Sequence, residues 1–175
     1  MLGRAKLNSM TKEICTVCRN PRAYTNCALC ESALCKSCEH FQETDAFSFL
    51  EELPEDLKHG HYCPNCFDEK VAPVQAKYEE TMALAREVNI FFIADKHPPY
   101  LLKSAKRQVS IKDCKDREET ILRLGFKAAE MGFNSVAKVN ITSTQIRNLG
   151  YQTSSWHGTG LPADIDLAKF LRSQK

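Results

Sequence analysis

The chain has 175 residues, nine of them cysteine, and its 24 Lys+Arg and 22 Asp+Glu residues leave a formal net charge of +2. This charge is divided unevenly: residues 1–89 carry 10 basic and 14 acidic side chains, a net charge of −4, whereas residues 90–175 carry 14 and 8, a net charge of +6. An acidic first half repels phosphate groups. This argues against nucleic acid or an anionic membrane as its ligand, because binding to either relies on a dense cationic surface.

Eight of the nine cysteines form Cys-x-x-Cys pairs, which are Cys15/Cys18, Cys27/Cys30, Cys35/Cys38 and Cys63/Cys66. One such pair holds two thiolates about 2.3 Å from a metal ion, and two pairs complete a tetrahedral structural site without an open position. The sequence therefore predicts two Zn²⁺ ions per chain in two closed sites.

Three other roles of these cysteines have to be weighed against zinc binding, namely iron binding, disulfide formation and redox chemistry. Iron, alone or in a cluster, remains an alternative because sets of four cysteines also hold it. Disulfides fit poorly, because the two cysteines of one short turn are badly placed to bridge each other. Residues 1–11 also lack the apolar core and cleavage site of a signal peptide, so we expect a cytoplasmic protein with reduced thiols. A thioredoxin-like dithiol needs one such motif, not four.

The spacing of the pairs is typical of a known family. Four residues separate the second and third pairs in CALCESALCKSC, and the last pair follows in HYCPNCF. On these motifs residues 12–70 resemble the FYVE family of two-zinc fingers and its rabphilin-related members. The resemblance implies a cross-brace domain of treble-clef type, with Cys15, Cys18, Cys35 and Cys38 on one ion and Cys27, Cys30, Cys63 and Cys66 on the other. Sequential pairing, as in tandem zinc ribbons, remains an alternative.

The resemblance does not extend to lipid binding. FYVE domains bind phosphoinositides through a basic Arg-Arg-His-His-Cys-Arg run around the third ligand, and residues 23–28 of this chain read Ala-Tyr-Thr-Asn-Cys-Ala. No cation remains there to neutralise a phosphorylated headgroup. A phosphoinositide-binding adaptor is therefore only the third function that we consider.

Residues 39–62 form an insertion between the third and fourth pairs. Phe47, Leu50 and Leu53 follow Asp45 at helical spacing, which predicts a short amphipathic helix ended by Pro54. Its apolar face would pack over the second zinc site or contact a partner. Three histidines lie near ligands and are expected to be surface or supporting residues, because eight thiolates are available: His40, His59 and His61.

A linking helix is predicted over residues 71–89, because the segment 68–89 has few helix breakers after Pro73. An apolar stripe at helical spacing runs along it, made of Val74, Tyr78, Met82 and Ala85. This stripe either packs within the chain or forms a seam with a second copy.

Residues 90–175 are predicted to form a small α/β domain, so that the whole chain is α+β. One helix starts at Asp116 and ends at Gly132, with Ile121, Leu124, Ala128 and Met131 on one face. The main order is strand, helix, strand, strand, with a further strand before the helix and breaks at 96–100 and 147–150. Short apolar or alternating runs predict strands over residues 88–94, 107–111, 135–144 and 151–160.

Glycine-containing motifs in this half are similar to those of the YbjQ family, which is often labelled heavy-metal-binding. The residues are Gly132, Phe133, Asn134, Ser135 and Val136, then Gly158, Thr159 and Gly160. The resemblance implies a domain that assembles into a ring. Sheet edges such as 88–94 or 151–157 would then pair between subunits. Cys114, His97 and His157 are too scattered in the sequence for a closed metal site.

No catalytic residue is assigned. Closed tetrathiolate sites leave no position for a substrate, and a nucleophile elbow and a P-loop are absent, while Gly158-x-Gly160 alone is a weak nucleotide signal. RING ubiquitin ligases commonly place a histidine among their ligands and keep different spacings. We therefore expect a non-enzymatic zinc-binding interaction or scaffold protein with protein partners, homo-oligomeric through its second domain. The alternative is a metal or small-ligand sensor that uses the second domain.

Overall fold

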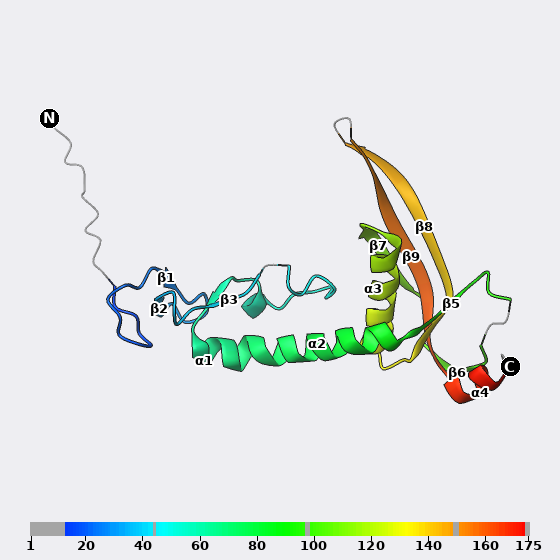
Figure 1. Ribbon diagram of the computed structural model, residues 1–175, viewed down its shortest axis with the longest axis horizontal. Coiled ribbons are helices and arrows are strands. Elements are labelled where there is room, and N and C mark those ends of the chain that lie inside the picture. The colour runs from blue at the N-terminus through cyan, green and yellow to red at the C-terminus, as the bar shows by residue number, and fades with distance from the viewer. Residues whose placement is uncertain (1–12, 44, 97–98, 149–150, 174–175) are drawn as a thin grey trace. The chain divides into compact units, whose positions relative to one another are not determined.

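The computed structural model of the protein (Figure 1) describes residues 13–43, 45–96, 99–148 and 151–173. It is a mixed α/β structure with two compact units, Met1–Lys77 and Tyr78–Lys175. The boundary between the units falls inside the segment 71–89 that the sequence assigned to a linking helix.

The first unit holds two very short antiparallel strand pairs. Strand β1 (Thr25–Asn26) pairs with β2 (Ala33–Leu34), and β3 (His40–Phe41) pairs with β4 (His61–Tyr62). The side chains of Leu34 and Tyr62 are fully buried. These pairs bring segments that carry different cysteine pairs next to one another.

The helix predicted over residues 45–53 is absent from the described part of the insertion. The backbone N–H groups of Ala46, Ser48 and Leu50 each donate to the carbonyl three residues earlier, so the segment forms successive turns instead of an α-helix. So short an isolated helix is marginal, and burial of Phe47 needs only a turn. Pro54 also ends no helix, because it directly precedes the 3₁₀ turn η1 (Glu55–Leu57).

Helical structure begins earlier than predicted, at the last cysteine pair. Helix α1 (Pro64–Cys66) continues through a wide π turn, η2 (Phe67–Val71), into α2 (Ala72–Glu87). Pro73 is the second residue of α2 and comes two residues after the π turn, so the missing proline N–H falls where the regular α-helical bonding pattern is already interrupted. The predicted stripe is only partly buried, but its later members pack within the second unit: Tyr78 lies 5.4 Å from the Phe126 ring, and Ala85 is buried.

The second unit is built on a five-stranded sheet in the order β5-β8-β9-β6, in which β7 also pairs with β9. Strand β5 runs parallel to β8, and the other pairs are antiparallel. The strands are β5 (Asn89–Phe92), β6 (Leu101–Ser104), β7 (Val109–Cys114), β8 (Ser135–Asn148) and β9 (Tyr151–Ile165). Strand β6 and helix α4 (Leu167–Ser173) were not predicted, and β8 and β9 are longer than predicted. Residues 97–98 and 149–150, which fall in the predicted breaks, lie outside the described residues.

The prediction that residues 151–157 form a sheet edge is wrong for the end of that segment. Strand β9 pairs with β8 along its length and with β7 at Trp156. Strand β5, in contrast, is bonded only to β8 among the described strands, as an edge strand would be. Strand β9 is an interior strand because it pairs with β8 on one side and with β6 and β7 on the other.

Helix α3 (Arg117–Glu130) has capping residues at both ends. The Asp116 carboxylate accepts a hydrogen bond from the Glu119 N–H (2.7 Å), and the Glu119 carboxylate accepts one from the Lys115 N–H (2.9 Å). At the other end Gly132 has the left-handed φ of 77° that favours glycine, as predicted. Leu124 and Ala128 are fully buried, but Met131, past the last helical residue, is exposed.

Two glycines of β9 allow close packing, Gly158 against α3 and Gly160 against β8. A Cβ atom on Gly158 would lie 2.6 Å from the Thr120 side chain of α3, and one on Gly160 would lie 2.4 Å from the Val136 side chain. Packing therefore explains this Gly-x-Gly pair. The core beside it contains Leu124, Ala128, Val136 and Val139.

Candidate metal centres

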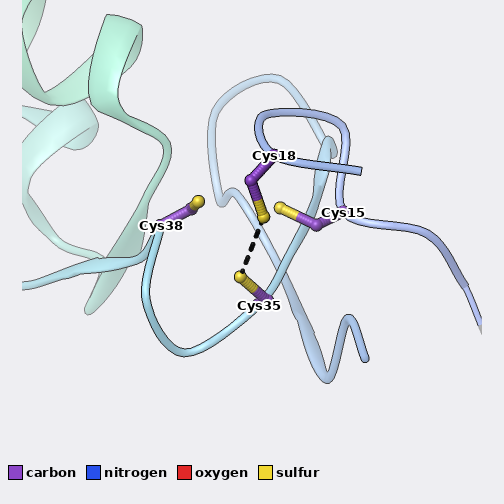
Figure 2. A group of neighbouring side chains, drawn as sticks. All are labelled: Cys15, Cys18, Cys35 and Cys38. Carbon is purple, nitrogen blue, oxygen red and sulfur yellow. Dashed lines mark hydrogen bonds between the residues drawn. The ribbon is translucent and has the colours of Figure 1, made fainter. Parts of the chain in front are cut away.

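The first and third cysteine pairs meet in one group (Figure 2). The four sulfur atoms of Cys15, Cys18, Cys35 and Cys38 all lie within 4.8 Å of one another, and those of Cys18 and Cys35 are 3.5 Å apart. Four sulfurs at about 2.3 Å from a central ion would be separated by about 3.8 Å. The group therefore has the size of a tetrathiolate metal site.

Backbone hydrogen bonds place the first pair against the third. Arg19 adopts a left-handed φ of 60° and its N–H donates to the Cys15 carbonyl (2.8 Å), which closes a tight turn around the pair. The Thr16 N–H donates to the Ala33 carbonyl (2.9 Å), two residues before Cys35. These bonds hold thiols distant in sequence side by side.

The second and fourth pairs form an equivalent group. The sulfurs of Cys27, Cys30, Cys63 and Cys66 lie within 4.8 Å of one another, and those of Cys30 and Cys63 are 3.7 Å apart. The turn is repeated here: Glu31 has a φ of 60° and donates its N–H to the Cys27 carbonyl (2.9 Å). The Ala28 N–H then donates to the His61 carbonyl (2.9 Å), two residues before Cys63.

The fourth pair occupies a helix N-terminus. Cys63 is the N-cap of α1, Pro64 follows in the first turn, and the Cys66 N–H donates to the Cys63 sulfur (3.4 Å). The exposed N–H groups of a helix start favour negative charge, which stabilises thiolates. The sequence did not reveal this helix start, although a proline directly after a cysteine is a usable signal.

Each group of four cysteines contains two buried residues and one exposed residue. Cys15, Cys27, Cys35 and Cys63 are buried, whereas Cys18 and Cys30 are exposed. Cys27, Cys63 and Leu34 also form the buried centre of a small apolar cluster. Each group is therefore part of the interior of the first unit and opens to solvent on one side.

The thiols in each group differ in acidity. Hydrogen bonding from the Cys18 backbone lowers the pKa of Cys15 to about 6, and a hydrogen bond with the Ser32 side chain lowers the pKa of Cys30 to about 6. The hydrogen bond with the Cys18 thiol raises the pKa of Cys38 to about 12, and burial raises that of Cys63. Four thiolates this close repel one another, so full ionisation needs a compensating cation. A divalent ion that prefers sulfur fits this donor set.

The histidines near the ligands do not belong to either group. The His61 ring contacts the Glu39 carboxylate through Nδ1, and the His40 ring stacks on Phe67 at 4.5 Å. His59 is exposed, and its carbonyl accepts the Tyr62 hydroxyl (3.0 Å). Within the described residues, the possible metal-binding groups consist of cysteine alone.

The second unit gathers no comparable set among the described residues. Cys114 is buried, and its thiol lies 3.8 Å from the Lys112 carbonyl. The Nδ1 atom of His157 accepts the Asp113 N–H (3.4 Å), and its Nε2 lies 3.1 Å from the Thr144 hydroxyl. His97 lies outside the described residues.

Comparison of the chain with protein-family models, curated proteins and solved structures finds no match. The likeness to the FYVE and YbjQ families therefore rests on short sequence motifs alone. Among the described residues, no helix combines the length and the apolar character needed to cross a membrane.

Proposed function

We propose that the chain is a non-enzymatic zinc-binding interaction protein whose first unit binds two Zn²⁺ ions and whose second unit associates with copies of itself. One ion is held by Cys15, Cys18, Cys35 and Cys38, and the other by Cys27, Cys30, Cys63 and Cys66. The observation that carries the proposal is the gathering of eight thiols into two groups of four, each no wider than 4.8 Å between sulfurs.

A cross-brace of treble-clef type is the arrangement that we propose for this unit. In support, the Cys27–Cys30 turn is bonded to β4, and Cys63 and Cys66 start the helix that follows β4. A metal-binding turn, a strand pair and a helix thus contribute to one site. The first group interlocks with it because Cys35 and Cys38 lie in the chain between the two pairs of the second group.

The ligand set argues for a structural role of the metal. Four thiolates saturate a tetrahedral ion, so no position is open for water or a substrate. Each such site carries a net charge of about −2, which adds to the acidic character of the unit. Exposed acidic residues also lie in and just before the turn η1, at Glu51, Glu52, Glu55 and Asp56, of which Glu55 pairs with Lys58 and Asp56 with Lys70. The partner that we expect is therefore a protein with a cationic surface.

Self-association of the second unit would multiply a weak contact made by the first. Two linked sites engage one assembly more tightly than either site alone. In support, β5 has only one bonded neighbour among the described strands, and unpaired sheet edges favour pairing between chains.

Elemental analysis of the purified full chain tests the zinc assignment. We expect two zinc ions per chain, and Cys27→Ser should leave at most one, because structural zinc contributes roughly 10 kcal/mol or more to the folding of small domains. Cys114→Ser is the matched control and should keep both ions, because Cys114 lies in the other unit. Stoichiometric iron, or full zinc content in Cys27→Ser, would refute the assignment.

A further inference from the structure

The hairpin of β8 and β9 extends past the rest of its sheet. The pairing of β5 with β8 ends at Val139. The pairing of β7 with β9 ends at Trp156, on the side of the β8–β9 turn. Beyond these points, residues 141–147 of β8 pair only with residues 152–158 of β9, and residues 152–155 of β9 pair only with β8 within the described chain. Figure 1 shows this two-stranded segment, which we call the arm, continuing beyond β7 and α3.

The arm has no core of its own. Residues 142–147 and 152–154 are all exposed, including Ile146 at 44%. A two-stranded ribbon by itself is marginally stable in water, and three or more strands are needed for independent stability. The arm nevertheless carries β-branched residues that favour strands, among them Thr142, Thr144 and Thr153. An additional strand would stabilise it.

The outer edge of β8 is the side open to such a strand. The Val139 carbonyl accepts the Ile93 N–H (3.0 Å) on the β5 side. Because backbone polar groups alternate between the two sides of a strand, those of Ile141, Ser143, Gln145 and Arg147 face the same side. No described strand pairs with them there.

This edge also lacks the features that protect edges from pairing. Strand β6 carries Lys103, and Lys106 follows it, whereas residues 141–147 contain a single charge, Arg147, and no proline or glycine. Long uncharged edges are templates for another strand. In an antiparallel pair of two identical edges centred on Thr144, Ser143 faces Gln145 and Arg147 faces Ile141. The two arginines then lie at opposite ends and do not repel each other.

We propose that the outer edge of β8 in the arm pairs with the same edge of a second copy of the chain, so that the two sheets join across a twofold axis. This inference rests on the self-association in the proposed function and names its interface. An interface in which one surface meets its own copy closes as a dimer. The ring implied by the YbjQ resemblance would need a different contact.

Charge variants of the full zinc-loaded chain test this interface by analytical ultracentrifugation. We expect the wild type to be dimeric. Ser143→Lys with Gln145→Lys should raise the dimer dissociation constant about tenfold or more, because like charges would face each other directly. Ser143→Glu with Gln145→Glu should do the same. An equimolar mixture of the two variants should restore the dimer, which also shows that both are folded.

Gln152→Lys with Ser154→Lys is the matched control, with equal added charge on the exposed part of β9, and should remain dimeric. If every variant dimerises like the wild type, or the mixture stays monomeric, the β8 edge is not the interface although self-association stands. A subunit number other than two also overturns the inference. A monomeric wild type contradicts both the edge and the proposed self-association, while its zinc content tests the metal sites separately.

Discussion

Arg19 and Glu31 occupy equivalent places, each directly after the second cysteine of a pair and each with a φ of 60°. A left-handed backbone is unusual for such residues, and it persists here because the N–H of each closes the turn around its cysteine pair. Short spacing in the sequence predicted the four cysteine pairs, whereas the grouping of the first pair with the third and of the second with the fourth was implied by the FYVE resemblance and agrees with the two groups of sulfurs. The sequence did not predict these two residues, since nothing in the side chain of arginine or glutamate marks a left-handed position.

Glu119 offers a prediction about pH at the scale of one residue. Burial opposes its ionisation, yet the hydrogen bond from the Lys115 N–H and the Arg123 guanidinium hold its pKa below its ordinary value. Ionised Glu119 therefore stabilises the second unit above the ordinary carboxyl pKa, and this contribution is lost as the pH falls through the lower pKa of the folded state.

We expect Glu119→Gln to cost about 1 kcal/mol of unfolding free energy at neutral pH and progressively less in acid. Denaturant unfolding followed by the fluorescence of Trp156, the chain's one tryptophan, measures this unit. Glu118→Gln, at an exposed position one residue away, is the control and should change little. An equal effect of Glu119→Gln at every pH would contradict the assigned role of its charge.

At the scale of elements, sequence patterns predicted correctly those helices and strands that bury one face. Helix α3 was predictable because Asp116 and Gly132 mark its ends and its apolar residues recur at helical spacing. The prediction of a helix over residues 45–53 was wrong because successive turns can also bury an apolar residue of this segment, such as Phe47. The far part of β8 was missed because its exposed residues do not alternate with buried ones. Polar strands of this kind are recognisable only from their partner.

For the whole molecule, two separate units imply two separate responses to metal removal. The first unit has a thin core in which several of the buried residues are metal-site cysteines, whereas the second has an apolar core between α3 and its sheet. Domain boundaries were harder to place from sequence, because α2 continues without a break across the division at Lys77 and Tyr78.

We therefore expect a chelator to unfold residues 15–66 and leave the sheet of the second unit intact. Hydrogen exchange should show lost protection of amides in the first unit, while those of β7, β8 and β9 stay protected and Trp156 fluorescence is unchanged. Untreated protein in the same buffer is the control. Simultaneous loss of protection in both units would show that their stabilities are not independent, and no loss in either would contradict a structural role for the metal.

X-ray absorption at the zinc K-edge tests the central claim most directly, because it reports the atoms bound to the metal in the intact protein. Two closed cysteine sites predict an average shell of four sulfur atoms at about 2.3 Å, without nitrogen or oxygen. A shell with nitrogen or oxygen at about 2.0–2.2 Å, or fewer than four sulfurs per zinc, would contradict the account, because a histidine or water would then occupy a position assigned to cysteine.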